Sequence, residues 1–231
     1  MKGRAWMIWV LSILVVLALL VAWSVYTDRS NYTYYKMTVE VETPQGVKTG
    51  HAVREVHFSP LSGSILGTSR PQWRLRGEAV AIDIAPGQTL FALLSSDSGQ
   101  VDYAGRDVST MLQKARNSGL LDPLELWPSP PGGVIRPFKE ALPMLVTFKD
   151  AADPKSILKV EPDAMDGLFG PDVQLKRITV QAVDERVTTG IEARLEWLRN
   201  HQGSLDYSGR LHPQNPEKDL TVAAFKQGQN K

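Results

Sequence analysis

Two kinds of hydrophobic pattern divide this chain. Residues 5–27 contain no charged side chain and lie between Arg4 and Asp28. At about 1.5 Å per residue, these positions would reach roughly 34 Å in a helix, whereas the hydrocarbon core of a bilayer is about 30 Å thick. Beyond residue 35, apolar positions recur with the shorter periods of strands and amphipathic helices. The pattern predicts one N-terminal transmembrane helix and, after it, a folded domain.

The residues around the apolar segment predict its orientation. Lys2 and Arg4 precede it, and Trp9 and Trp23 lie near its two ends. Positive charges favour the cytoplasmic side of a membrane, and Trp rings favour the headgroup level. We therefore expect a single-pass anchor with a cytoplasmic N-terminus. The alternative is a cleavable signal peptide with Ala22–Ser24 as its nearest cleavage site, but such a peptide usually has a shorter apolar core of about 7–15 residues.

Alternating apolar and polar residues predict strands in the first half of the domain. Turn residues at 43–46 and at 85–88 separate two pairs of such runs. We expect four antiparallel strands, with residues 89–94 in the centre of the sheet because they are apolar almost throughout, and with the first hairpin nearer an edge. The expected strands comprise residues 36–42, 47–58, 73–84 and 89–94.

Helical periodicity occurs twice in the domain. Residues 107–117 place four apolar residues on one face, and a glycine at position 119 provides a stop. The four are Val108, Met111, Leu112 and Ala115. Residues 189–192 fit a capping box and predict a second helix, with Ile191, Leu195 and Leu198 on its inward face. The fold class is therefore α+β: a mainly antiparallel sheet domain with two principal helices, preceded by one N-terminal transmembrane helix.

The remaining segments predict shorter elements. Six prolines in residues 122–143 preclude long elements and predict an irregular connector. Residues 173–183 predict a long strand, with a bulge near 176–177 where the apolar parity changes. A buried strand, a helical turn and a possible edge strand are expected at residues 144–148, 162–168 and 220–225.

These elements predict the organisation of the chain. About 200 residues outside the anchor suffice for one domain with its own core, and two lobes are the alternative. The predicted parts are a cytoplasmic N-terminus (1–4), a transmembrane anchor (5–27), a juxtamembrane linker (28–35), a periplasmic α+β domain (36–225, with lobes 36–121 and 144–225 joined by 122–143) and a tail (226–231).

Composition excludes several classes of function. Without Lys2 and Arg4, 24 basic side chains stand against 25 acidic ones, and the two signs are scattered along the chain. No nucleic-acid partner is expected, because such binding requires a basic surface. The chain has no cysteine, so it has neither a disulfide nor a thiolate metal site. We expect no cofactor.

The candidate catalytic motif is weak. Residues 156–159 (Ser-Ile-Leu-Lys) and 48–50 (Lys-Thr-Gly) match short signatures of penicillin-binding proteins and β-lactamases. However, the two signatures stand in reversed order, and Ser156 lies in a short segment between Pro154 and Pro162 instead of at the start of a long helix. Coincidence is the better interpretation, and no catalytic residue is predicted.

The other candidate ligands have simpler explanations. His51 and His57 lie on one predicted strand, about 20 Å apart, which is too far for one metal ion. Asp163 and Asp166 lack the remaining ligands of a calcium loop and fit helix capping. No metal-binding or cofactor-binding residue is predicted. Three tryptophans of the domain belong either to the core or to the wall of a ligand groove: Trp73, Trp127 and Trp197.

Several segments carry a resemblance to a set of known proteins. They are residues 143–148 (PMLVTF), the turn at 150–154, 168–170 (LFG), 187–191 (VTTGI), 195–198 (LEWL) and 76–80 (RGEAV). Over residues 36–210 this pattern resembles uncharacterised single-anchor envelope proteins of proteobacteria. The resemblance implies a bacterial envelope location and no known activity.

The sequence thus predicts a location more firmly than an activity. We expect a non-enzymatic accessory or protein-interaction domain at the bacterial inner membrane, with its bulk in the periplasm and an envelope protein as a partner. The alternative is an envelope hydrolase that acts on cell-wall or ester substrates through a site near His51, His57 or Ser156. Ala18 and Ala22 form a small-residue patch, which predicts weak homodimerisation through the membrane helix.

Overall fold

The computed structural model describes most of the chain in two compact units. One unit comprises Met1–Tyr32 and Phe58–Gln72, and the other comprises Thr33–His57 and Trp73–Lys231. The described residues are 2–29, 32–62, 70–97, 103–119, 123–128, 142–205 and 220–228.

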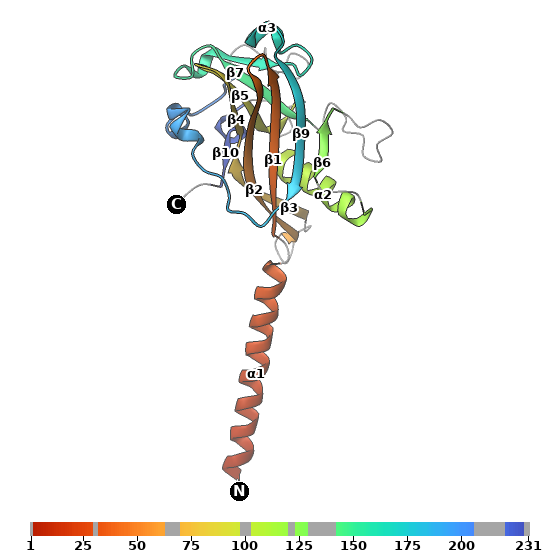
Figure 1. Cartoon of the computed structure of the whole chain (residues 1–231). Coiled ribbons are helices and arrows are strands. Elements are labelled where there is room, and N and C mark those ends of the chain that lie inside the picture. The colour runs from red at the N-terminus through yellow and green to blue at the C-terminus, as the bar shows by residue number, and fades with distance from the viewer. Residues whose placement is uncertain are drawn as a thin grey trace. The chain divides into compact units, whose positions relative to one another are not determined.

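The first unit consists mainly of one long helix, α1 (Lys2–Arg29) (Figure 1). No glycine or proline interrupts it after residue 3, and its Leu, Ala and Met residues favour helix. Its described side chains, from Trp9 to Trp23, are all exposed. Among the residues that the structure describes, no helix has the length and apolarity needed to cross a membrane. The predicted helix over residues 5–27 is thus confirmed, and the predicted membrane span is not.

The larger sheet has six strands, in the order β10-β3-β2-β1-β9-β6. The first hairpin is confirmed, since β1 and β2 are neighbours joined by a short turn. The expectation that it lies near an edge is wrong, because β9 pairs with the other side of β1, as Figure 1 shows. The strands are β1 (Tyr32–Thr43), β2 (Gly46–Ser62), β3 (Arg70–Glu78), β6 (Leu124–Trp127), β9 (Gln174–Ala182) and β10 (Lys226–Gln227).

The register of β1 and β9 contains the predicted bulge. Glu40 lies opposite Arg177. The next residue of β1, Val41, lies opposite Leu175. Lys176 is therefore an extra residue in β9, which returns the apolar side chains on both sides of it to the same face of the sheet.

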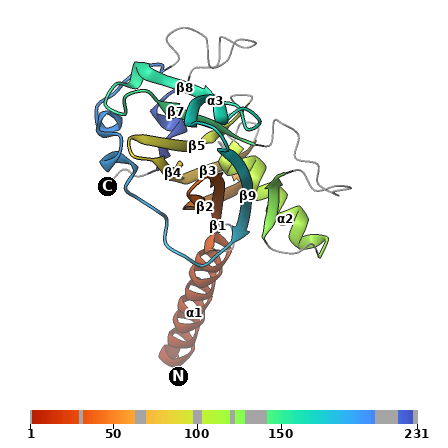
Figure 2. The same cartoon turned by 45° about the horizontal axis from the view of Figure 1, so that its top comes forward.

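The smaller sheet has four strands, in the order β4-β5-β7-β8. Each described pair in it is antiparallel, and Figure 2 shows these strands running across the direction of β1 and β9. As expected, residues 89–94 lie in an internal strand, and residues 144–148 form a buried strand. The strands are β4 (Val80–Ala85), β5 (Gln88–Ser96), β7 (Pro143–Phe148) and β8 (Ile157–Val160).

The chain changes sheets between β3 and β4. The sequence predicted one strand over residues 73–84, but β3 ends at Glu78 in the larger sheet, and β4 begins two residues later in the smaller one. Gly77 has φ +152°, which a residue with a side chain rarely adopts. Ala79 donates its N–H to the carbonyl of Phe225 at 2.7 Å, outside either strand ladder. The break is therefore fixed by tertiary contacts that strand periodicity does not report.

Two buried clusters hold the second unit together. The inner cluster lies between the two sheets and packs against helix α2 (Val108–Asn117); Met37 and Leu90 belong to it. The outer cluster lies on the opposite face of the smaller sheet, under the C-terminal segment, and includes Phe91 and Phe225. Successive residues of β5 contribute to different clusters, so both faces of this strand are buried. Both clusters draw residues from both sides of the proline-rich connector.

Of the two helices predicted in this domain, the first is confirmed. Helix α2 buries three of the four residues on its predicted inward face, Val108, Leu112 and Ala115. The fourth, Met111, is half-buried and packs against the inner cluster. Gly119 follows its end with φ +66°, a conformation that glycine adopts readily at a helix terminus.

The second predicted helix is wrong. Residues 191–193 and 196–199 form two separate 3₁₀ turns instead. Glu192 does not complete a capping box, because its carboxylate pairs with Lys226. Leu195 lies between the turns with φ −129° and ψ 79°, far from helical values. The predicted inward side chains are nevertheless buried in the outer cluster: Ile191, Leu195 and Leu198.

Three shorter predictions are corrected in detail. The helical turn expected at residues 162–168 occurs as α3 (Asp166–Phe169). Residues 222–224 form a 3₁₀ turn, and the edge strand, β10, follows it. The connector contains β6, which was not expected; residues 129–141 of it lie outside the described residues. The domain is thus α+β with mostly antiparallel sheets and few helices.

Candidate functional site

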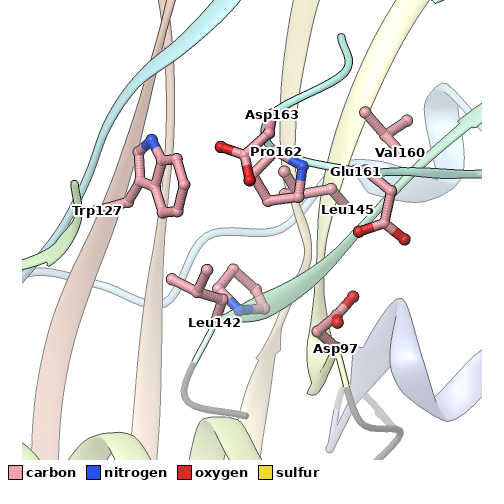
Figure 3. A pocket seen from close by; sticks show the side chains of 9 residues that line it. Asp97, Trp127, Leu142, Leu145, Val160, Glu161, Pro162 and Asp163 are labelled. Carbon is pink, nitrogen blue, oxygen red and sulfur yellow. The ribbon is translucent and has the colours of Figure 1, made fainter. Parts of the chain in front are cut away.

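One pocket of the domain lies where strands of both sheets end. In the smaller sheet β5 and β8 end and β7 begins beside it, and β6 contributes from the larger sheet. The cavity itself has a volume of about 20 Å³, room for about one water molecule, and the space between its atoms reaches about 340 Å³ only when the open solvent at its mouth is included. We call it the Trp127 pocket; Figure 3 shows its lining residues, which are Asp97, Trp127, Leu142, Pro143, Leu145, Val160, Glu161, Pro162 and Asp163.

Trp127 forms one wall of this pocket. It is the last residue of β6 and pairs with Ile178 of β9. Its indole N–H donates to the carbonyl oxygen of Leu175 at 3.2 Å, which fixes the polar edge of the ring to the sheet. The ring is only half-buried, and Figure 3 places it across the open space from Asp163. An indole held in this way can contact an apolar group or a cation through its face.

The floor of the pocket is apolar. Leu142, Leu145 and Val160 are buried, and all three belong to the inner cluster. Because these side chains are packed into the core, the floor is a fixed surface of the sandwich. An occupant of the pocket would therefore meet apolar atoms at its inner end.

Three carboxylates border the pocket. Lys159 Nζ lies 3.0 Å from Asp97 Oδ1 and 3.1 Å from Glu161 Oε1. Partial burial acts to lower the pKa of Lys159, but the hydrogen bonds to these two carboxylates outweigh it, so this pKa is raised. The Asp163 carboxylate has no hydrogen bond or ion pair with any residue that the structure describes. With Lys159 counted, the three acids leave a net charge of about −2 here.

The lining suits the binding of a cation better than catalysis. The described residues around the pocket offer carboxylates, an indole and aliphatic groups, but no hydroxyl, thiol or imidazole nucleophile. Two of the carboxylates are already paired with Lys159, which leaves Asp163 to meet an incoming charge. Apolar walls beneath that charge favour a ligand with both an apolar and a cationic part.

Ser156, the candidate nucleophile, has a structural role. Its Oγ donates to the backbone carbonyls of Asp150 and Asp153 at 2.7 and 2.8 Å, and accepts the N–H of Asp150 at 3.0 Å. Lys159 lies on β8 and pairs with carboxylates, and Lys48 lies on β2 in the larger sheet. The hydrogen bonds of Ser156 stabilise a turn. This arrangement is consistent with the interpretation that the motifs match by coincidence.

The predicted tryptophan groove involves one of its three candidates. Trp197 packs against Phe148 and Phe225, with ring centroids 5.7 Å away in each case, and belongs with the outer cluster. Trp73 packs against the inner cluster. Only Trp127 of the three lines the pocket.

The histidines and aspartates singled out in the sequence are not brought together. His51 and His57 both lie on β2, and the described part of the chain contains no group of acidic and histidine side chains suited to a metal ion. Asp166 accepts the N–H of Gly167 at 2.9 Å, whereas Asp163 borders the pocket. Sequence reasoning named Asp163 and Trp127 but gave no signal that they share a site, because they lie on separate segments.

A buried polar centre in the inner cluster was missed altogether. The Arg54 side chain is fully buried, and its guanidinium donates to the carbonyl oxygens of Glu78 and Ala92 at 3.1 and 3.4 Å. It also lies 3.4 Å from the hydroxyl of Tyr35. One signal was available in the sequence, since Arg54 occupies a parity of β2 that is otherwise apolar from residue 50 to residue 58. Its contacts join β1, β2, β3 and β5, so it has the position of a structural group between the two sheets.

Two tyrosines complete this centre. The Tyr35 hydroxyl donates to the carbonyl of Ala104 at 2.7 Å, whereas the Tyr103 hydroxyl has no hydrogen-bond partner among the described residues. Burial raises the pKa of Tyr35, an effect that Arg54 partly offsets. Burial, and then the neighbouring Tyr35, raise the pKa of Tyr103 well above its usual value. Both hydroxyls therefore stay neutral at physiological pH.

The chain was compared with family models, with curated proteins and with solved structures. No family model, no curated protein and no solved structure matches this chain.

Proposed function

We propose that this protein is a non-enzymatic interaction domain of the bacterial envelope, held at the inner membrane by helix α1. Its N-terminus lies in the cytoplasm, and the α+β domain lies in the periplasm and binds another envelope protein. The observation that carries this proposal is the Trp127 pocket, which has a fixed aromatic wall, an apolar floor and a carboxylate that has no partner among the described residues.

The character of α1 supports the membrane location. Trp9 and Trp23 are 72% and 69% exposed, and the apolar side chains between them are exposed as well. Apolar surface of this extent is costly in water and is well accommodated by lipid. The uncharged stretch covers residues 5–27, which is more than the residues from Trp9 to Trp23 whose side chains are described. This stretch would reach roughly 34 Å in a helix. Lys2 and Arg4 before it favour a cytoplasmic N-terminus.

The alternative, an envelope hydrolase, has no observation in its favour. Its best nucleophile, Ser156, uses its hydroxyl on the backbone of a neighbouring turn. Homodimerisation through Ala18 and Ala22 stays a prediction; both are exposed on α1, four residues apart.

A localisation experiment tests the first half of the proposal. A reporter that is active only in the periplasm, fused after Lys231, should be active, and the protein should resist extraction of the membranes with alkaline carbonate. A reporter that is active only in the cytoplasm serves as the control. Cytoplasmic activity at Lys231, or release of the protein by carbonate, would contradict the location.

A capture experiment tests the second half. The full-length protein is crosslinked in intact cells with a short amine-reactive reagent, solubilised and purified under denaturing conditions. The proposal predicts one recurrent protein adduct that depends on the crosslinker. The absence of any recurrent adduct at several expression levels would contradict an interaction domain.

A further inference from the structure

We propose that the Trp127 pocket binds the side chain of a lysine or arginine that a partner protein presents on an extended segment. The inference rests on the proposed function, because it names the chemistry of the partner at the same site. It follows from three features of the pocket: its walls, its charge and its position at the ends of both sheets.

The walls of the pocket match the two parts of such a side chain. Lysine and arginine consist of an aliphatic stem and a cationic head. The half-buried Pro162 offers apolar surface at the mouth of the pocket, along which the stem can lie, whereas Leu145 and Val160 are almost fully buried. The indole face of Trp127 suits either part, since aliphatic chains pack against it and cations are attracted to its face. A bare metal ion would gain nothing from such walls, and the pocket offers it too few ligands.

The charge of the pocket favours a cation over an anion or a neutral group. Asp97 and Glu161 together carry two negative charges, whereas the Lys159 that pairs with both carries one positive charge. Asp163 has no partner among the described residues and lies across the open space from Trp127 in Figure 3. A cationic head between this carboxylate and the indole would be paired on both sides.

The position of the pocket favours a side chain carried by a protein. In the described part of the chain, β6 and β8 are the last strands of their sheets, and they contribute Trp127 and Val160 to the lining. The outer backbone of a last strand can pair with an added extended segment, which positions alternate side chains of that segment for pockets. A free amine has no peptide backbone and so cannot pair with these strand edges.

Direct binding tests the inference with a defined probe. The probe is the peptide acetyl-Thr-Val-Arg-Val-Thr-amide, used as the analyte in surface plasmon resonance, with the full-length protein immobilised in phosphatidylcholine nanodiscs. The same peptide with citrulline in place of arginine is the control, because citrulline keeps the shape and lacks the charge. We expect the arginine peptide to bind about tenfold more tightly at about 0.1 M salt.

Matched variants locate the binding. Asp163→Asn should weaken binding of the arginine peptide by about 3- to 10-fold, and Trp127→Phe, which keeps a ring, by about 2- to 3-fold. Asp172→Asn removes the same charge from another exposed aspartate, whose φ of +62° asparagine also tolerates, and should leave binding unchanged. Because Asp163 is exposed and has no partner in the part of the chain that the structure describes, its variant should unfold at the same temperature as the parent.

The outcomes separate this inference from the proposed function. Equal binding of the two peptides, or equal effects of the variants at positions 163 and 172, would overturn the inference. Tight binding of spermidine without binding of the arginine peptide would overturn it too, because the cation would then be a free amine. If a protein adduct is captured while the arginine peptide does not bind, the proposed function stands and this inference fails. If the peptide binds as expected but no adduct forms, the proposed function fails, and with it the partner protein named here, although the pocket recognises an arginine side chain.

Discussion

The inner and outer clusters of the domain are stabilised in different ways. The inner cluster lies between two sheets, and its polar centre, around Arg54, is hydrogen-bonded to several strands. The outer cluster is mainly aliphatic around a group of packed aromatic rings, and an irregular segment with short 3₁₀ turns covers it. Strand ladders therefore fix the first, whereas side-chain packing must fix the second. We expect the cover of the outer cluster to open at a lower free energy than the inner cluster.

The largest effect is expected from Phe225→Ala. Phe225 is fully buried, and its ring lies 5.7–6.2 Å from the rings of Phe91, Phe148 and Trp197. Its removal should lower the free energy of unfolding by about 3–5 kcal/mol in urea denaturation. Val222→Ala, at a partly buried position of the same turn, should cost about 1 kcal/mol.

Hydrogen exchange shows whether that loss is local. In Phe225→Ala the amides of residues 191–199 should lose protection before those of β1. Equal loss of protection in both regions would contradict a separate stability for the cover.

A smaller effect is expected where Gly77 passes Arg54. A Cβ at Gly77 would lie 2.8 Å from Arg54 Cγ, and φ is +152° there. Gly77→Ala should cost about 2–3 kcal/mol by chemical denaturation, from strain and contact together. Gly87→Ala is the matched control, because its φ is +77° and no atom lies within 4 Å of the added Cβ; it should cost about 1 kcal/mol.

A double-mutant cycle isolates the contact. In an Arg54→Ala background, the cost of Gly77→Ala should fall by about 1 kcal/mol, because Cγ is gone. An unchanged cost would show that backbone strain alone requires glycine at this position.

The smallest effect is expected at the buried tyrosines under alkaline conditions. Because burial raises the pKa of Tyr35 and of Tyr103, both stay neutral in the folded protein at a pH where they would ionise in the unfolded chain. Their contribution is complete below pH of about 10 and is lost as the pH rises above it, by up to about 1.4 kcal/mol per pH unit for each tyrosine.

Tyr103→Phe tests the assignment. The variant should be more stable by about 1 kcal/mol at neutral pH, because it removes a buried hydroxyl without a partner among the described residues. It should also lose stability less steeply above pH of about 10 in urea titrations. A slope equal to that of the parent would mean that Tyr103 is not protected from ionisation.

Local patterns predicted those parts of the fold that local interactions determine. Alternation located β1, nearly continuous apolar runs located β5 and β7, and a change of parity located the bulge at Lys176. Helical periodicity located α2. These elements depend on which face of a strand or helix is apolar, and the sequence contains that information.

The errors have tertiary causes. The spacing of Ile191, Leu195 and Leu198 matches a helix, yet these side chains reach the outer cluster from two 3₁₀ turns, because Glu192 pairs with Lys226. The break after Glu78 depends on contacts with Arg54 and with the C-terminal segment. Trp127 was a candidate for a ligand groove, but its neighbours in the pocket come from three other segments, which no sequence spacing brings together.

The central claim is that a partner protein docks at the Trp127 pocket, and site-specific photo-crosslinking tests it most directly. A photoreactive amino acid replaces the exposed Glu161 at the pocket in one variant and the exposed Gln45 at the turn between β1 and β2 in another. After irradiation of intact cells, we predict a discrete protein adduct at position 161 and none at position 45. The absence of an adduct at position 161, or the same adduct at both positions, would contradict the claim.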